Sequence, residues 1–213
     1  MLKAIILSSK SDPGALIDIL EEGKLFDVES AADPDAVLAD AEASFDYDLF
    51  VIDGCAPDLN AESRRNFEHS LGSGAGLLFV RAAASPHPWP LIDKLAVWLT
   101  PATSPASAPE RLNVRYLDHQ HPVTRGLRDF EIVDSVPAGG MACDDDVHRI
   151  LAASSPIESA AEDPAFIPAM ISTHHGRGRV FHCVLTPAAG GEPLRRAIGR
   201  AAEWAATGNV IDF

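Results

Sequence analysis

Residues Gly72–Ala84 read GSGAGLLFVRAAA, and this stretch decides the fold. A glycine-rich turn leads into the apolar run Leu77–Val80, and Arg81 follows at once. An apolar run this short, entered through glycines, is typical of a strand buried on both faces of a parallel sheet. Ligands of such sheets bind outside the carboxyl ends of the strands, so we expect Arg81 to mark the floor of a cleft. Its planar guanidinium suits a carboxylate or a phosphate; the alternative is an ion pair with one of the chain's own acids.

Apolar runs and helical patterns alternate on the amino-terminal side of this stretch. Strands are predicted over Leu2–Leu7, Leu25–Ser30 and Tyr47–Gly54, and helices over Ala15–Glu22, from Asp33 to about Ala43 and over Asn60–Leu71. One helix between each two strands predicts right-handed crossovers and a parallel sheet with helices on both faces. On the carboxyl-terminal side we expect helices over Leu91–Leu99 and Pro193–Thr207, and strands over Leu112–Leu117, Phe130–Val133, Val147–Ser154, Ala169–Thr173 and Arg179–Leu185. The length fits one domain over residues 1–213.

The charge balance is acidic, with 31 Asp and Glu residues against 17 Lys and Arg and a formal net charge of −14. That balance disfavours nucleic acids and anionic membranes as partners, because both carry the same sign. The three cysteines, Cys55, Cys143 and Cys183, lack a short metal-type spacing, and their odd number suggests reduced thiols in a cytoplasm. The amino-terminal run is short, and no stretch reaches the roughly 18 apolar residues of a membrane span. We therefore expect a cytoplasmic protein.

Polar residues follow two of the other predicted strands. Ser8 opens the polar loop after the first strand, and Asp53 stands at the exit of the strand over Tyr47–Gly54. Because the carboxyl ends of parallel strands meet at one edge of the sheet, we expect Ser8, Asp53 and Arg81 to lie near one ligand. The alternative for Asp53 is a loop acid or the cap of a short turn.

Histidines and one basic turn give weaker signals. His119 and His121 lie two residues apart and point to one side of an extended segment. Residues that could add to a metal set are His174, His175, His182 and Asp134. The alternative is solvent-exposed loop histidines, with His182 in or beside the core. The run GRGR, Gly176–Arg179, precedes a strand and predicts a hairpin turn with solvated arginines.

The segment His121–Asp134 reads HPVTRGLRDFEIVD and resembles the HPIT-x-GL-x-x-FEI-x-DE segment of the trehalose-utilisation (ThuA-like) family. Gly176–Phe181, GRGRVF, resembles the family's GKGRVFY, and the terminal Trp204 and Ala205 resemble its closing WA. The first half agrees in outline, so the likeness spans nearly the whole chain. It implies the fold of class I glutamine amidotransferases, a flavodoxin-like three-layer α/β/α sandwich with a mostly parallel sheet.

The chain departs from the family pattern at three polar positions. Arg81 stands where the family has a histidine after the central strand, Ser135 follows Asp134 in place of the second acid of DE, and Thr186-Pro187 replaces GH. The amidotransferase reaction is not implied, because it needs a cysteine at the elbow after the central strand and a histidine to activate it. Either the ligand differs and is more anionic, or the catalytic role is lost.

Three hypotheses about function remain. The resemblance implies a carbohydrate-associated protein that binds a small polar or anionic ligand, a sugar or a sugar acid, at the carboxyl edge of the sheet. The side chains expected around that ligand are Ser8, Asp53, Arg81, Asp134 and Thr186. The alternative is a non-catalytic binding or assembly module with a filled cleft and an apolar patch that forms homo-oligomers. A metal hydrolase built on the histidines is the third. No cofactor is implied, and the sequence leaves open whether the chain is an enzyme.

Overall fold

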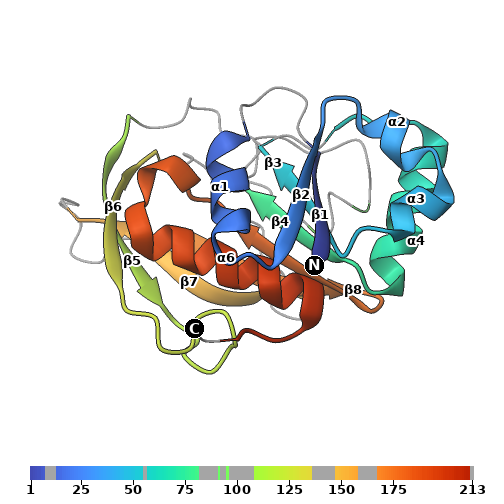
Figure 1. Ribbon diagram of the computed structural model, residues 1–213. Helices are drawn as coiled ribbons and strands as arrows, with labels where there is room; N and C mark the ends of the chain where they lie inside the picture. The colour runs from blue at the N-terminus through green and yellow to red at the C-terminus, as the bar shows by residue number, and fades with distance from the viewer. Residues whose placement is uncertain are drawn as a thin grey trace.

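The computed structural model describes residues 1–7, 13–54, 57–81, 91, 95, 108–135, 147–157 and 167–211. Its described strands form one sheet in the order β2-β1-β3-β4-β9-β8-β7-β5-β6 (Figure 1). The strands are β1 (Leu2–Leu7), β2 (Phe26–Ala31), β3 (Leu49–Asp53), β4 (Gly76–Val80), β5 (Glu110–Tyr116), β6 (Phe130–Asp134), β7 (Arg149–Pro156), β8 (Ile167–His175) and β9 (Gly178–Cys183). The helices are α1 (Gly14–Glu22), α2 (Pro34–Leu38), α3 (Ala41–Phe45), α4 (Ala61–Ser73), the short 3₁₀ helix η1 (Pro187–Ala189) and α6 (Gly191–Thr207).

One half of the sheet is parallel, as the alternation of strands and helices predicts. β1 pairs with β2 and β3, β3 pairs with β4, and β4 pairs with β9, all in parallel. Every residue of β3 and β4 is buried, which explains why their sequences read as continuous apolar runs instead of alternating. The carboxyl ends of β3, β4 and β9 therefore meet at the same edge of the sheet.

The other half is antiparallel, so the expectation of a mostly parallel sheet is wrong. β8 pairs antiparallel with β9 and β7, and β5 pairs antiparallel with β7 and β6. The physical reason lies in the connections: only Gly176 and Arg177 join β8 to β9, whereas a parallel pair needs a crossover of about a dozen residues or more. The sheet is mixed, and its parallel half carries the predicted ligand edge.

Helices cover both faces of the parallel half, which gives three layers there (Figure 1). On one face, side chains of α1 and α6 such as Leu16 and Ile198 share a core with alternate residues of the strands. On the other face, Leu38 of α2 and Phe67 of α4 pack with the remaining strand residues. Among the described helices, none combines the length and the apolar character needed to cross a membrane. The described residues of the predicted helix Leu91–Leu99 are Leu91 and Leu95, and the rest of it lies outside them.

The glycine before β4 allows the strand to pass close to the end of α6. A Cβ atom on Gly76 would lie 2.5 Å from the carbonyl carbon of Ala205, so no larger residue fits without moving the backbone. The glycine-rich entry to the central strand is thus a packing requirement between β4 and the last turn of α6.

Two local predictions are corrected by polar contacts. The helix expected from Asp33 to about Ala43 is divided into α2 and α3, because the Asp40 side chain accepts hydrogen bonds from the N–H groups of Glu42 and Ala43 and starts a new helix. The solvated arginine expected at Arg179 is wrong as well. Its guanidinium donates to the carbonyls of Trp204, Ala205 and Ala206 at 2.9, 3.0 and 2.9 Å, and so caps the carboxyl end of α6.

Candidate functional site

Asp53 and Arg81 form an ion pair at the carboxyl ends of β3 and β4. The Arg81 Nε donates to Asp53 Oδ1 and the Arg81 Nη2 donates to Asp53 Oδ2, both at 2.6 Å. The Asp53 side chain is 4% exposed and the Arg81 side chain 36% exposed. The alternative that one of the chain's own acids holds Arg81 is therefore confirmed. The buried carboxylate fixes the guanidinium by two parallel bonds, while the Arg81 side chain as a whole stays partly exposed.

The backbone at Arg81 adopts the left-handed conformation, with φ of 65°. This conformation is uncommon for a residue other than glycine and costs roughly 1–2 kcal/mol. Two neighbours in β9 hold it: the Arg81 N–H donates to the Cys183 carbonyl at 2.8 Å, and the His182 side chain is hydrogen-bonded to the Arg81 backbone. A strained residue directly after a buried strand is also found at nucleophile elbows, but here that residue is an arginine and not a nucleophile.

Asp134 and Thr186 form a second pair, at the ends of β6 and β9. Asp134 is buried, and its Oδ2 accepts the Thr186 N–H at 2.7 Å while its Oδ1 accepts the Thr186 hydroxyl at 3.0 Å. The N–H of Ser135 also donates to Oδ1, at 2.8 Å. Three donors from the chain itself thus satisfy this carboxylate, which ties the edge strand β6 to the segment that leads into η1.

The four described members of the predicted site fall into these two pairs. Thr186 follows shortly after Cys183, whose carbonyl accepts the Arg81 N–H, so both pairs lie along the same edge of the sheet. The hydrogen bonds given above join residues within each pair, and whether the four side chains converge on one ligand stays a prediction. Ser8, the fifth member, lies outside the described residues.

Sequence reasoning placed His182 in or beside the core and gave it no role at Arg81. His182 is 3% exposed, and its ring packs against Phe79 with centroids 5.6 Å apart. Burial lowers the pKa of His182 to about 4, so the imidazole is neutral at physiological pH. Its neighbour Cys183 is a buried thiol whose pKa burial raises to about 12, which makes it a poor nucleophile.

The histidines do not form a metal site within the described residues. No group of three or more His, Cys, Asp or Glu side chains suited to a metal ion is present in that part of the chain. The ring of His121 packs edge-on against Trp204 with centroids 4.7 Å apart, and its Nδ1 accepts the Val123 N–H. Burial lowers the pKa of His121 to about 4. His121 is therefore a core histidine that fixes the turn after β5.

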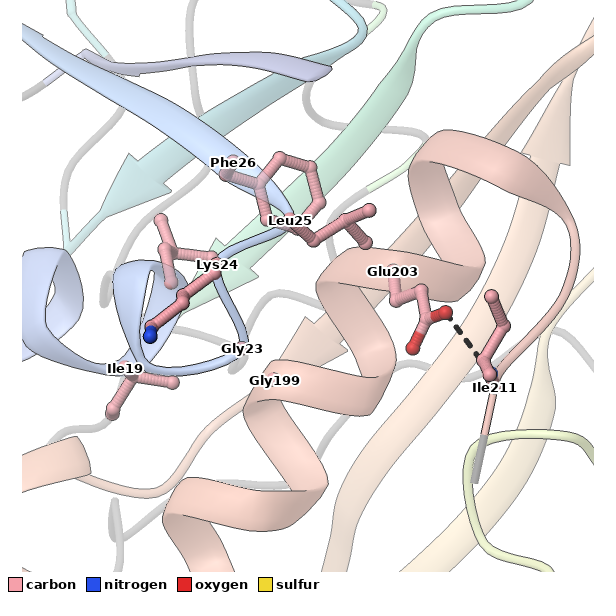
Figure 2. A pocket seen from close by; sticks show the side chains of 9 residues that line it. Ile19, Gly23, Lys24, Leu25, Phe26, Gly199, Glu203 and Ile211 are labelled. Carbon is pink, nitrogen blue, oxygen red and sulfur yellow. Dashed lines mark hydrogen bonds between the residues drawn. The ribbon is translucent and has the colours of Figure 1, made fainter. Parts of the chain in front are cut away.

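The two larger hollows given for the described surface lie away from the predicted site residues. One, of about 260 Å³, lies between the end of α1 and α6, with Phe26 and Leu25 above it and Ile211 at its side (Figure 2). Its walls are mostly apolar, and Glu203 on α6 accepts the Ile211 N–H at 2.9 Å. The other, of about 270 Å³, lies beside the first turns of α6 and is lined by arginines and acids.

Comparison with known proteins agrees with the fold and with the motifs. Residues 8–205 match the model of the ThuA family, which is described as trehalose utilisation. A ThuA-like protein from Parabacteroides merdae is 20% identical with a TM-score of 0.78, over 100% of this chain and 92% of that one. A protein from Thermoplasma acidophilum that is named for GMP synthase is 13% identical with a TM-score of 0.55, over 96% of each chain.

The same fold also occurs within larger proteins. A β-galactosidase from Rahnella sp. R3 is 13% identical with a TM-score of 0.61, over 96% of this chain and 31% of that one. No curated protein matches the chain. At these identities the solved structures establish the fold alone, whereas the family match covers most of the chain and includes the HPVT and GRVF segments. The chain belongs to the ThuA trehalose-utilisation family.

Proposed function

We propose that this chain binds a small polar ligand, a sugar or a sugar acid, at the carboxyl edge of the parallel half-sheet. In this proposal Asp53 and Arg81 form its floor, and Asp134, Thr186 and Ser8 are the further side chains expected to contact it. The observation that carries the proposal is the partly exposed side chain of Arg81, which a buried carboxylate fixes and whose backbone is strained. Strain of this kind is kept where the surroundings hold a side chain in one position, and it concentrates at ligand sites.

The chemistry of the pair favours hydroxyl and single carboxylate groups. A guanidinium has five N–H donors in one plane, and two of these donate to Asp53. The remaining donors face away from the Asp53 carboxylate and can bind vicinal hydroxyls or one carboxylate of a sugar acid. Because Asp53 already neutralises the Arg81 charge, a doubly charged phosphate gains less here than it would from an unpaired arginine.

A specific observation favours a second candidate, a non-catalytic binding or assembly module. The chain matches only 31% of the β-galactosidase from Rahnella sp. R3, so this fold also serves as one part of a larger enzyme that acts on a sugar. In that case the Asp134–Thr186 and Asp53–Arg81 pairs stabilise strand ends, and the edge of the sheet contacts a protein instead of a small molecule.

A thermal-shift screen separates the two candidates. Trehalose, glucose, gluconate, glucuronate and glucose 6-phosphate are added to the wild type, to Arg81→Gly and to the control Arg111→Ala, whose arginine lies on β5 and pairs with the exposed Glu131 of β6. A ligand at ten times its Kd stabilises by about 1.4 kcal/mol, or about 3–6 °C for a chain of this size. The proposal expects that shift in the wild type and the control and its loss in Arg81→Gly. Without a shift for any of the five compounds, the small-ligand proposal fails.

A further inference from the structure

The hollow shown in Figure 2 lies between α1, the turn into β2 and α6, and we call it the α1–α6 hollow. It has a volume of about 260 Å³, and none of the residues predicted for the sugar site lines it. The lining residues are Ile19, Leu20, Gly23, Lys24, Leu25, Phe26, Gly199, Glu203 and Ile211. Ile19, Leu20 and Phe26 are at most 5% exposed and belong to the core, so core side chains form part of its wall.

Two glycines line the α1–α6 hollow although neither the backbone nor the packing requires glycine there. Gly199 lies inside α6, where glycine is less stable than alanine, and a Cβ atom at this position would approach Ile19 only to 4.0 Å. Gly23 has an ordinary φ of −77°, and a Cβ there would meet nothing within 4 Å. Gly76, by contrast, has no room for a Cβ. The space beside Gly23 and Gly199 is open to an occupant, and keeping it open costs stability.

Lys24 is a third position at the α1–α6 hollow that lowers stability. Its φ is 52°, and Arg81 is the other described residue besides glycine with a positive φ. Glycine commonly takes this conformation after a helix, yet here Gly23 has the ordinary φ and the lysine after it is strained. Glycine at residue 24 would relieve the strain but would remove the aliphatic stem that lines the hollow. Three neighbouring positions that forgo stability around one hollow indicate that the hollow has a function.

The charged side chains at the α1–α6 hollow favour neither an anion nor a cation. One lysine and one glutamate line it, and Figure 2 shows the Lys24 ammonium and the Glu203 carboxylate on opposite sides of Leu25. The Glu203 carboxylate already accepts the Ile211 N–H at 2.9 Å. The walls between these two groups are mostly apolar. A charged ligand would lose its water there without a dedicated partner, whereas an uncharged apolar group only gains from leaving water.

We propose that the α1–α6 hollow binds a small uncharged apolar molecule, one aromatic ring or a branched hydrocarbon of similar size, against Leu25, Phe26 and the open face of Gly199. An apolar cavity of about 150 Å³ holds benzene, so about 260 Å³ accommodates one ring with a short substituent. Burial of apolar surface drives this binding, and the glycines supply the room for it. The proposal goes beyond the sugar site and does not depend on it.

Titration with indole and with 2-phenylethanol, followed by the methyl NMR signals of Ile19, Leu25 and Ile211, tests this site. We expect saturable shifts with a Kd of about 1 mM or tighter. Gly199→Leu fills the open space and is expected to weaken binding at least tenfold. The matched control Gly72→Leu makes the same exchange in α4, at a residue that does not line the hollow, and is expected to bind like the wild type. Phenylacetate and 2-phenylethylammonium, which add a charge of either sign, should bind at least fivefold more weakly than 2-phenylethanol.

Lys24→Gly supplies a readout that a merely structural role would not move. We expect it to melt at a higher temperature than the wild type and to bind indole at least threefold more weakly, because the strain and one wall are removed together. If leucine at residue 199 prevents folding, Gly199→Ala repeats the test, since its Cβ fits at 4.0 Å from Ile19.

Four results would overturn the proposal: shifts that grow without saturation, equal loss in Gly199→Leu and Gly72→Leu, tight binding of a charged analogue, or unchanged binding in Lys24→Gly. A fifth concerns Phe213, which lies outside the described residues. A tenfold gain in affinity in Phe213→Ala would assign the hollow to the chain itself and not to a ligand. Arg81→Gly should bind indole like the wild type, so this test and the sugar screen fail or succeed independently.

Discussion

Replacing Arg81 by alanine and, in parallel, by glycine separates the two features that make this residue unusual. Both substitutions remove the guanidinium and leave the Asp53 carboxylate, which is 4% exposed, without its two 2.6 Å donors. Removing one partner of a buried ion pair costs about 3–5 kcal/mol. The two variants differ in the backbone, because the native φ of 65° suits glycine and strains alanine.

The expected difference between the variants follows from that φ angle. At an ordinary position alanine is more stable than glycine by about 0.5–1 kcal/mol, since glycine loses more freedom on folding. In the left-handed region the order reverses, and we expect Arg81→Gly to be more stable than Arg81→Ala by about 1 kcal/mol. With a slope of about 2.5 kcal/mol per molar urea, this corresponds to about 0.4 M between their unfolding midpoints.

Urea unfolding followed by tryptophan fluorescence measures both quantities. Arg111→Ala serves as the control, since it breaks an exposed ion pair with Glu131 and is expected to cost at most about 1 kcal/mol. If alanine at residue 81 is as stable as glycine, the left-handed strain is not real. If both variants lose less than about 1 kcal/mol, the Asp53–Arg81 pair does not fix this edge of the sheet.

Three further substitutions or conditions test other parts of the structure. The pKa of His182 is lowered from 6.5 to about 4, so its contribution to stability should be full above pH 6.5 and fall by up to about 3 kcal/mol as the pH drops towards 4. Urea midpoints at pH 4.5 and 7.5 measure this, and His182→Gln should reduce the difference and leave the part that comes from His121, whose pKa is lowered in the same way. Gly199→Ala should add about 0.5–1 kcal/mol to the free energy of unfolding and so raise the melting temperature, because alanine favours the helix and a Cβ there lies 4.0 Å from Ile19. An unchanged or lower melting temperature contradicts this packing. Lys24→Gly should stabilise the protein by a similar amount in the same melting experiment, since Lys24, beside the hollow in Figure 2, has a φ of 52° that suits glycine. The neighbouring Gly23 has a φ of −77°, so Gly23→Ala should be no less stable than the wild type.

The parallel half of the sheet was predictable because each apolar run was followed by a helical pattern with a clear end. The direction of the later strands was not predictable, since the alternating pattern of a short strand such as β5 is the same in a parallel and in an antiparallel sheet. The two-residue connection Gly176-Arg177 was the one local signal of an antiparallel pair. Arg179 was misread for a related reason: its partners are carbonyls at the end of α6, which no local pattern brings near.

The site was predictable where it depends on strand ends. Asp53 and Arg81 each follow an apolar run, and neighbouring parallel strands bring such residues together at one edge. The support from His182 was hidden, because its contact with Arg81 depends on the pairing of β9 with β4, two strands separated by a long stretch of sequence. The Asp134–Thr186 pair came from the family motif and not from any residue pattern within one element.

The Nε–H NMR signal of Arg81 tests the central claim most directly, because that proton lies in the 2.6 Å bond to Asp53, which should slow its exchange with water. The signal is assigned by its absence from Arg81→Lys and followed while glucuronate is added. We predict one sharp Arg81 signal without ligand and a saturable shift with glucuronate, with the Arg111 signal stationary. Glucuronate binding that moves other signals and leaves Arg81 unchanged would contradict the assignment of this guanidinium to the ligand site.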